Sequence, residues 1–510
     1  MADRLVTRAV DTPPVSARRG PVLSSVSPGQ WVALLLLLFG AVWLAHLSYT
    51  SLSPPTDNIE QLTWVSALEG GYYKHPPLPT WLFWMPVQLF GVTAWTSYVV
   101  GATCTLGTMA MLWRLLCDMR GWRYATLALL AVLCITYYNG RLYYYNHNVV
   151  LMVFVTASAY CCWKARLTGR IGWWVALGLT IGLGALAKYQ IAVTVACVLV
   201  FWLTQRGWRD PRQRLGLLLS SLVALLVFSP HIAWLRAHDF GPISYAIESS
   251  LGAHLDPSTR ASESLHWMAD QVLNRAMPAW ILLVVAVVVP RRHDAQRGSA
   301  SVESAPASRD AGRALLLSWG LVPLAFMPAV GLVVGADLQL QWGTPFLLFA
   351  VPAAMELASK RIRWNGVPLR PALKVFAGLQ LLLILLSHVT SSRGIAALQD
   401  HHWRTFDSAE LAKVLEQPAR AALGGKIDVV SGPAAPAGAL ALTLEDRPRV
   451  MIDGRADRSP WIKSDLLGRC GILELGTSGS LSNSLPVGEA FPGLVWRVTK
   501  PNRNGAACSG

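Results

Sequence analysis

The chain has 510 residues, of which 53% are hydrophobic and only 14% are charged, with a formal net charge of +15. Soluble proteins carry about a quarter charged residues, so this composition excludes an ordinary soluble protein and indicates a membrane protein. The positive charge is not that of a nucleic-acid-binding protein, because Lys and Arg are confined to short turns between apolar runs.

Residues 1–30 are expected to form a cytoplasmic tail. They are rich in arginine, contain no apolar stretch of their own, and are not followed by a small-residue cleavage site, so they do not have the pattern of a cleaved signal peptide. The uncharged run that follows, from Trp31 to Ser48, has the roughly 18 residues that a bilayer crossing needs. The first crossing is therefore expected to be an uncleaved anchor.

Apolar runs along the chain predict about eleven crossings, and a shorter amphipathic stretch at 79–92 is expected to lie along the outer interface. The runs lie at 31–50, 95–117, 123–139, 148–165, 171–187, 190–205, 215–234, 276–290, 314–334, 343–358 and 371–389. Basic residues fill alternate turns, which marks those turns and the N-terminus as cytoplasmic. An odd number of crossings then places the C-terminal region outside.

The regions between and after the crossings differ in composition. Residues 291–313 have the composition of a flexible cytoplasmic linker. Residues 391–510 are predicted to be a small exported α/β domain, in which no pattern indicates catalysis, and Cys470 and Cys508 could pair there if it is exported. Its strand-like runs begin at Ile427, Arg449, Gly471 and Leu494, and its helical patterns cover 407–416 and 418–423.

Unusual polar and aromatic residues gather in the loops expected on the outer side. These loops are 51–80, 139–148, 188–190, 231–275 and 335–342. Polar groups next to a membrane are costly unless they line a site, so the pattern predicts a one-sided polar cavity at the outer membrane interface.

Four stretches, all at the outer side, carry a family resemblance. They are Asp57 after the first crossing, the segment 72–81, the helix start Asn148-x-x-Leu-x-x-Phe, and the glycine-rich 182–188. In this order they resemble the GT-C glycosyltransferases, and most closely glycosyltransferase family 39, which includes protein O-mannosyltransferases and lipid A aminoarabinose transferases. The resemblance covers roughly residues 30–390. It implies a polyprenyl-phosphate sugar donor, transfer outside the cytoplasm, and an Asp supplied by the first outer loop.

Three departures prevent a direct transfer of the substrate from these relatives. Aminoarabinose transferases tend to have Glu-Lys before Pro-Pro, where this chain has Lys74-His75. Many members have Asp where this chain has Asn148, and protein mannosyltransferases commonly have Asp-Glu where it has Asp57-Asn58. The sugar and the acceptor, whether a lipid A-type glycolipid, another envelope glycan or a protein, therefore stay open.

Asp57 is the candidate catalytic base, which would take a proton from the acceptor as the lipid phosphate leaves. The alternative is that Asp57 only caps the helix that follows it. Lys74, His75 and Lys188 are the candidate contacts of the donor phosphate. Their alternative roles are lysines that reach the lipid headgroups and a histidine in a turn.

A second group of residues is expected to bind substrate or to support the site. It comprises Glu60, Tyr73, Arg141, Asn146, His147, Asn148, Tyr189, Gln190, His238, Glu248, Gln341 and Trp342. The alternatives are an interaction with the helix dipole for Glu60, interfacial belts for the Tyr and Trp residues, a structural role for His147, and ordinary loop polarity for His238 and Glu248.

Together these features predict an all-α polytopic membrane protein of the GT-C type, with about 11 or more transmembrane helices, outer-face juxtamembrane helices and a small C-terminal α/β domain. The expected domains are 1–30, the catalytic membrane domain 31–390, and the periplasmic domain 391–510. The expected location is a bacterial inner membrane. No Asp-x-Asp and no metal-ligand spacing occurs, so we expect transfer without a metal or other cofactor. The competing interpretation is a transporter or flippase for an anionic lipid-linked substrate, which would need cations but no base.

Overall fold

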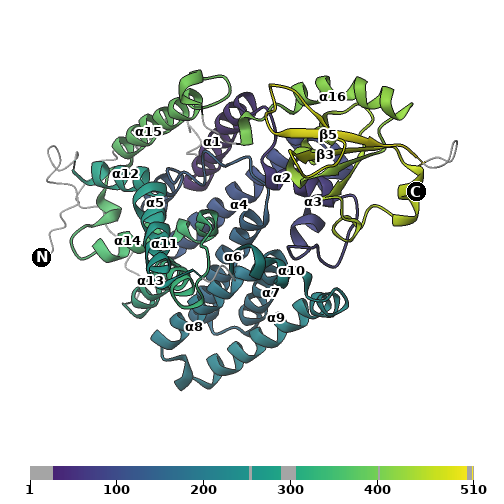
Figure 1. The fold of residues 1–510 in the computed structure, drawn as a ribbon. Coiled ribbons are helices and arrows are strands. Elements are labelled where there is room, and N and C mark those ends of the chain that lie inside the picture. Colours follow the sequence, from purple (N-terminus) through teal and green to yellow (C-terminus); the bar gives the residue numbers. More distant parts are fainter. Residues whose placement is uncertain (1–26, 252–254, 289–305, 400–402, 502–507, 509–510) are drawn as a thin grey trace, which may run out of the picture.

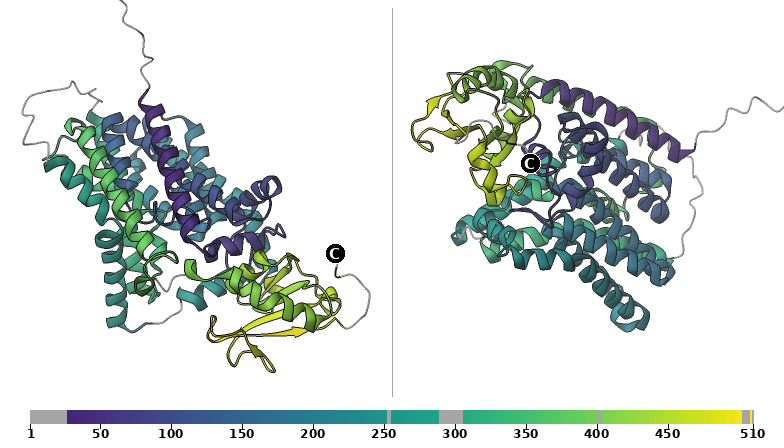
Figure 2. Two further views of the ribbon diagram at one scale, coloured as in Figure 1. Left: turned by 90° about the horizontal axis from the view of Figure 1, so that it is seen from above. Right: turned by 90° about the vertical axis from the view of Figure 1, so that its right-hand side faces the viewer.

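The computed structural model describes residues 27–251, 255–288, 306–399, 403–501 and 508. It consists of a helical body with a small sheet at one end (Figures 1 and 2). In Figure 1 the yellow C-terminal strands lie beside α2 (Thr56–Trp64). The predicted fold class, a helical protein with a small C-terminal α/β unit, is therefore confirmed in outline.

Six helices of the described residues are long and apolar enough to cross a membrane. They are α1 (Pro28–Thr50), α4 (Ala94–Arg120), α6 (His147–Thr168), α9 (Pro211–Ala237), α13 (Pro306–Val334) and α15 (Leu369–Val389). A seventh candidate is the bent pair Pro257–Arg275 and Met277–Val288, whose two parts meet at 46°. Because these helices expose large apolar side chains such as Leu226 and Leu381, they fit a lipid environment.

Shorter apolar helices occupy the remaining predicted crossings. They are α5 (Trp122–Val132), α7 (Ile171–Ala187), α8 (Ala192–Thr204) and α14 (Ala350–Ala358). Every predicted apolar run thus overlaps a helix, although the helices in the runs 123–139 and 343–358 are shorter than the runs, and the number of helices that cross the bilayer stays a prediction. The amphipathic stretch is α3 (Leu78–Phe90), which leaves Trp84, Met85 and Phe90 exposed, as expected for a helix along an interface.

Two expectations about local structure are wrong. The expected outer loop 231–275 is mostly helical, and the expected linker 291–313 is helical from Pro306 onward because α13 starts there, while 291–305 lies outside the described residues. The loop region holds the end of α9, then α10 (Gly241–Ala246), η3 (Ile247–Leu251), α11 (Pro257–Ala269), η4 (Asp270–Arg275) and the start of α12 (Met277–Val288). Their polar composition concealed these helices, because short polar helices have little apolar periodicity.

The C-terminal unit has a five-stranded sheet with the order β2-β1-β3-β5-β4. Strand β1 is parallel to β2 and β3, and β5 is antiparallel to β3 and β4. The strands are β1 (Val429–Gly432), β2 (Arg449–Ile452), β3 (Ile472–Thr477), β4 (Leu485–Pro486) and β5 (Leu494–Thr499). The four predicted strands are confirmed, β4 was missed, and a disulfide joins Cys470 to Cys508.

Two helices cover this sheet. The expected break between 416 and 418 is absent, because α16 (Ser408–Leu423) continues through Pro418 and buries Leu411, Leu415 and Ala419. This burial offsets the backbone hydrogen bond that proline cannot donate. Helix α17 (Ala434–Thr443) was not predicted.

The C-terminal unit holds the loop that carries Asp57. Helix α17 packs on α2 (Thr56–Trp64), where Gly438 lies so close to Ile59 that a larger side chain would clash. The segment before α2 is tied to the start of the C-terminal unit, because the Leu52 amide donates to the Arg404 carbonyl at 2.8 Å and Trp403 Nε1 donates to the Pro54 carbonyl at 2.7 Å. The entry to α2 is therefore fixed from the C-terminal side.

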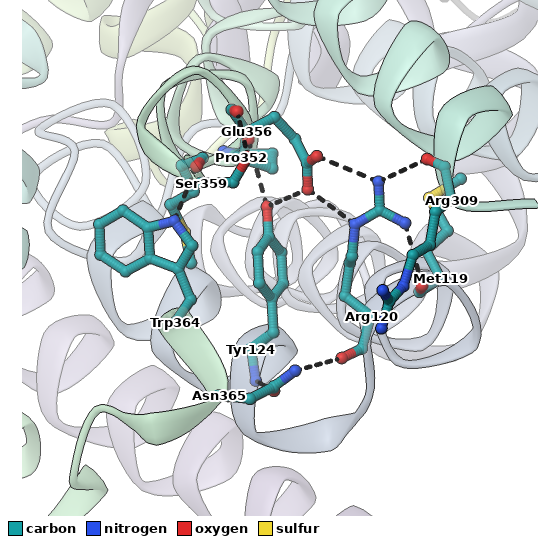
Figure 3. Close-up of polar contacts among 10 residues, drawn as sticks. Met119, Arg120, Tyr124, Arg309, Pro352, Glu356, Ser359, Trp364 and Asn365 are labelled. Carbon is teal, nitrogen blue, oxygen red and sulfur yellow. Dashed lines mark hydrogen bonds and ion pairs between the residues drawn. The ribbon is translucent and has the colours of Figure 1, made fainter. Parts of the chain in front are cut away.

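A buried ion pair connects four helices at the C-terminal end of α4 (Figure 3). Arg120 Nε lies 2.8 Å from Glu356 Oε1, which also accepts a hydrogen bond from the Tyr124 hydroxyl at 3.1 Å. The same guanidinium donates to the Arg309 carbonyl at 2.9 Å. Because every group finds a partner, we interpret this cluster as a structural clamp between α4, α5, α13 and α14.

Short helical turns complete the structure. They are η1 (Tyr189–Ile191), η2 (Gly207–Arg209), η6 (Leu340–Gly343), η7 (Leu347–Phe349), η8 (Trp364–Gly366), η9 (Ala396–Leu398), η10 (Trp403–Thr405), η11 (Ala456–Arg458) and η12 (Ser464–Arg469). Among them, η1 and η6 border the site described next.

Candidate functional site

A polar cavity of about 180 Å³ lies where three of the predicted outer loops meet. Its lining residues are Thr56, Asp57, Tyr137, Arg141, Tyr144, Asn146, Val149, Gln341 and Thr344. They come from α2, from the turns between α5 and α6, from the start of α6, and from η6 with the residue that follows it. The predicted gathering of these loops around a polar cavity is confirmed.

Asp57 projects into this cavity from the first turn of α2. The N-cap of α2 is Pro55, and no side chain caps the helix, so the capping role considered for Asp57 is wrong. Its Oδ2 atom accepts a hydrogen bond from Asn146 Nδ2 at 2.8 Å, and Oδ1 accepts none from the described residues. The α2 dipole favours the ionised carboxylate. One oxygen is thus held in place while the other is available to a ligand.

Asn146 orients Asp57 because its own amide is fixed. It is the N-cap of α6, and its Oδ1 accepts a hydrogen bond from the Val149 amide at 2.9 Å. That bond turns Nδ2 toward Asp57. The neighbouring Asn58 is fully buried and bonds Ser97 and the backbone of the 143–145 segment, so it fixes α2 against α4 and the turn before α6.

Lys188 lies beside the cavity, in the break between α7 and η1. Its Nζ donates to Asn148 Oδ1 at 2.6 Å and lies 5.8 Å from the ring centre of Trp342. The side chain is therefore directed into the protein rather than toward lipid headgroups. Burial lowers the pKa of Lys188 to about 8, and the negative charge of Asp57 opposes this shift.

No carboxylate neutralises Lys188 in the described chain. Its hydrogen-bond partner is the neutral amide of Asn148. A carboxylate there would form an ion pair with Lys188 and compete with an anionic ligand. The neutral side chain of Asn148 therefore leaves the charge of Lys188 available for a ligand.

Lys74 is already paired, unlike Lys188. It forms an ion pair with Glu60, one turn beyond Asp57 on α2, and the two side chains are only 14% and 11% exposed. The rings of Trp64, Tyr73 and Tyr245 lie within 6.0 Å of its Nζ. Although burial opposes the charge, Glu60 raises the pKa of Lys74 above its usual range. The partner of Glu60 is thus Lys74, and the pair fixes the loop to α2.

This pairing predicts how the two residues respond to substitution. Lys74→Met is expected to lower the free energy of unfolding by about 3 kcal/mol, because it leaves Glu60 buried without a partner. The double substitution Lys74→Met with Glu60→Gln is expected to recover most of this loss, as measured by thermal unfolding in detergent. Sugar transfer should recover with it; if transfer stays lost in a stable double variant, Lys74 contacts the substrate directly.

His75 and His147 contact each other next to this ion pair, with their ring planes tilted by 36°. Their ring centres are 3.9 Å apart, and both rings lie against Trp64. Burial lowers the pKa of His75 well below its usual value, and His147, Lys74 and Lys188 lower it further. His75 is therefore neutral near pH 7 and can offer a hydrogen bond but not a charge. His147 has a hydrogen bond with the Pro76 backbone, which fits the structural role considered above, whereas its Nε2 has no hydrogen-bond partner in the described chain.

The remaining predicted residues divide into two sets. Gln341 lines the cavity, and Gln190 donates to the Trp342 carbonyl at 2.9 Å, which holds Trp342 over Lys188. Tyr189 instead bonds His231 Nε2 at 2.8 Å, and His231 bonds the Gly70 carbonyl, a chain that joins α9 to the first outer loop.

His238, Glu248 and Tyr73 are among the predicted residues that do not line the cavity. His238 is exposed and stacks on Trp234 at 4.1 Å, and Glu248 is exposed in η3. Tyr73 stands between Lys74 and the C-terminal unit, with the Arg458 guanidinium 5.0 Å from its ring centre. The positions of His238 and Glu248 follow from the helices at the end of α9 and in 241–251, which the sequence pattern did not show.

Sequence reasoning did not predict five of the lining residues, namely Thr56, Tyr137, Tyr144, Val149 and Thr344. Tyr137 was assigned to a crossing at 123–139, but α5 ends at Val132 and the chain then turns. Asn139-Gly140 was an available turn signal. In the described part of the chain no group of three or more His, Cys, Asp or Glu side chains could hold a metal ion.

Comparisons with known proteins identify a matching family model and several relatives of this chain. The family model described as dolichyl-phosphate-mannose-protein mannosyltransferase matches residues 74–234. The lipopolysaccharide core galacturonosyltransferase RgtB of Rhizobium johnstonii is 28% identical over 41% of this chain and 42% of its own. The undecaprenyl phosphate-alpha-4-amino-4-deoxy-L-arabinose arabinosyl transferase of Pseudomonas aeruginosa is 26% identical over 59% of this chain and 55% of its own. The chain thus spans about half the length of these curated relatives.

Solved structures agree with the family resemblance. ArnT from Cupriavidus metallidurans in the apo state has a TM-score of 0.60 at 16% identity and covers 92% of this chain and 97% of its own. The same protein bound to undecaprenyl phosphate has a TM-score of 0.59 at 15% identity and covers 95% of this chain and 100% of its own. The chain therefore has the ArnT fold, and its resemblance to the GT-C glycosyltransferases related to family 39 is confirmed.

Proposed function

We propose that the chain is a membrane glycosyltransferase that moves a sugar from a polyprenyl-phosphate donor to an acceptor at the outer face of the inner membrane. One observation carries this proposal: a single cavity holds an oriented carboxylate with a free oxygen, and an unneutralised lysine stands beside it. These are the groups that a displacement at a sugar phosphate requires, namely a base for the acceptor and a positive charge for the leaving phosphate.

The reaction is a single displacement at the anomeric carbon. The acceptor hydroxyl or amine attacks this carbon, its proton passes to Asp57 Oδ1, and the bond between the anomeric carbon and the phosphate oxygen breaks. The bonding electrons leave with polyprenyl phosphate, and the anomeric configuration inverts. Asn146 holds the carboxylate in position during the attack, and Lys188 stabilises the charge that grows on the phosphate.

The other predicted phosphate contacts receive different roles. We assign His75 as a neutral hydrogen-bonding group near the phosphate, since it lies close enough to Lys188 for that charge to lower its pKa. Lys74 acts through Glu60 by holding the first outer loop. A metal ion has no part in this scheme.

The names of the relatives support the choice of donor and acceptor classes. One relative is named for undecaprenyl phosphate-aminoarabinose and another for the lipopolysaccharide core. We extend from these to a polyprenyl-phosphate sugar as donor and an envelope glycolipid as acceptor, with a glycan or protein acceptor as the alternative. The match of ArnT bound to undecaprenyl phosphate supports a lipid-linked donor.

The proposed location makes residues 391–510 a periplasmic domain and the N-terminus cytoplasmic. If so, the Cys470–Cys508 disulfide forms in cells, because the periplasm is oxidising. Both thiols are expected to resist a maleimide reagent in denatured whole-cell samples until a reductant is added, as read by mass spectrometry of the C-terminal peptides. Labelling without reduction would place this domain in the cytoplasm. The buried Cys134 serves as the internal control for a free thiol.

The test of the function is transfer by the purified protein. Protein in detergent is mixed with a radiolabelled polyprenyl-phosphate sugar and bacterial envelope glycolipid, and the products are separated. We expect labelled glycolipid and an equal amount of released polyprenyl phosphate. A flippase would instead move the intact donor across a proteoliposome bilayer without cleaving it, and that result would contradict the proposal.

A further inference from the structure

Arg141 is a cation in the cavity wall that the proposed reaction does not use. It belongs to the turns between α5 and α6, and its guanidinium carbon lies 5.5 Å from the ring centres of both Tyr137 and Tyr144. The two aromatic faces hold the planar group in one orientation at little cost. In the described chain no carboxylate pairs with Arg141.

The neighbouring Arg275 differs from Arg141 because it has a carboxylate partner. Arg275 lies 5.1 Å from the same Tyr137 ring, but its Nε is 3.0 Å from Asp270 Oδ2, so its charge is neutralised. Arg120, at the other end of the body, is likewise paired with Glu356. A partly buried guanidinium without a carboxylate carries a desolvation cost that an anionic ligand would offset.

The charges around the cavity determine which ligand fits. Asp57 is the one carboxylate among the described residues that line it, and that group is needed as the base. Lys188 serves the donor phosphate in the proposed reaction, which leaves the charge of Arg141 unmatched. An ammonium group on the sugar would be repelled by the guanidinium of Arg141, and no lining carboxylate besides Asp57 could pair with it. A sugar with a carboxylate would find a planar partner suited to two parallel hydrogen bonds.

We propose that Arg141 binds a carboxylate on the transferred sugar, and that the donor is a polyprenyl-phosphate uronic acid. This inference rests on the proposed glycosyl transfer and adds the class of sugar to it. The transferred group is then a uronic acid residue, and Arg141 determines specificity without taking part in bond making or breaking.

Two donors that differ only in the carboxylate test this assignment. Undecaprenyl-phosphate galacturonate and undecaprenyl-phosphate galactose are compared with wild type, Arg141→Gln and Arg141→Lys, and kcat/KM is measured for each pair. We expect wild type to prefer galacturonate, and Arg141→Gln to lose about 100-fold with galacturonate while its rate with galactose changes by less than about threefold. Arg141→Lys should be more active with galacturonate than Arg141→Gln, because lysine keeps the positive charge but cannot form two parallel hydrogen bonds to a carboxylate.

Each other outcome overturns the inference in a recognisable way. An equal loss with both donors would mean that Arg141 contacts the phosphate or supports the fold, and thermal unfolding of Arg141→Gln separates these two causes. A wild-type preference for galactose, or for an aminoarabinose donor added as a third arm, would exclude a uronic acid while leaving the glycosyl transfer intact. No transfer from any of the donors would contradict the proposed function itself.

Discussion

Asp57→Asn is expected to lower kcat for sugar transfer by about 1,000-fold, with little change in KM for the donor. Asn keeps the size of the side chain but cannot accept the acceptor proton. The carboxylate is held by Asn146 at one oxygen only, so the loss should appear in the chemical step rather than in folding. Transfer of a radiolabelled sugar by purified protein measures it.

Asp239→Asn is the matched control for this substitution. Asp239 is exposed, lies outside the cavity lining, and has a positive φ of 51° that Asn adopts readily. The control should keep full activity, and both variants should unfold at the wild-type temperature. Equal activity of Asp57→Asn and the control would exclude Asp57 as the base.

Lys188→Gln is expected to lower kcat/KM by about 100-fold or more, because it removes the charge that stabilises the leaving phosphate. The pH dependence gives a sharper result. Since burial lowers the pKa of Lys188 to about 8, the free protein carries the charge below this pH and loses it above. The kcat/KM of wild type should therefore fall as the pH rises through about 8, by up to tenfold per pH unit.

Lys188→Arg separates this charge from other ionisations. Arginine stays protonated at all accessible pH values, so the variant should be less active at pH 7 but lose the decline above pH 8. If the decline persists unchanged in Lys188→Arg, another group causes it and Lys188 does not supply the charge. Thermal unfolding at pH 7 and pH 9 shows whether the fold itself changes over this range.

Much of the architecture could be predicted from the sequence, because long apolar runs in lipid have few alternatives to helix. The alternation of basic and polar loops predicted that Asp57, Lys188 and Arg141 lie on the same side of the helical body. The polar helices of 231–275 were missed for the opposite reason: their stability comes from packing, which leaves no regular apolar pattern.

The pairing of side chains could not be predicted. Lys74 and Glu60 were both candidates for substrate contact, yet they are 14 residues apart and neutralise each other. Lys188 and Arg141 were in the same candidate set and stay without a carboxylate in the described chain. Only the three-dimensional arrangement separates a charge that holds a loop from a charge that a ligand can use.

The account is tested most directly by mass spectrometry of envelope glycolipids from cells that express wild type, Asp57→Asn or no protein, at matched levels. We predict a sugar-sized mass increment with wild type that is absent from the other two samples, and its mass identifies the sugar. An increment of equal size in the Asp57→Asn cells would contradict the assignment of the base. A wild type indistinguishable from cells without the protein would contradict transfer to an envelope glycolipid.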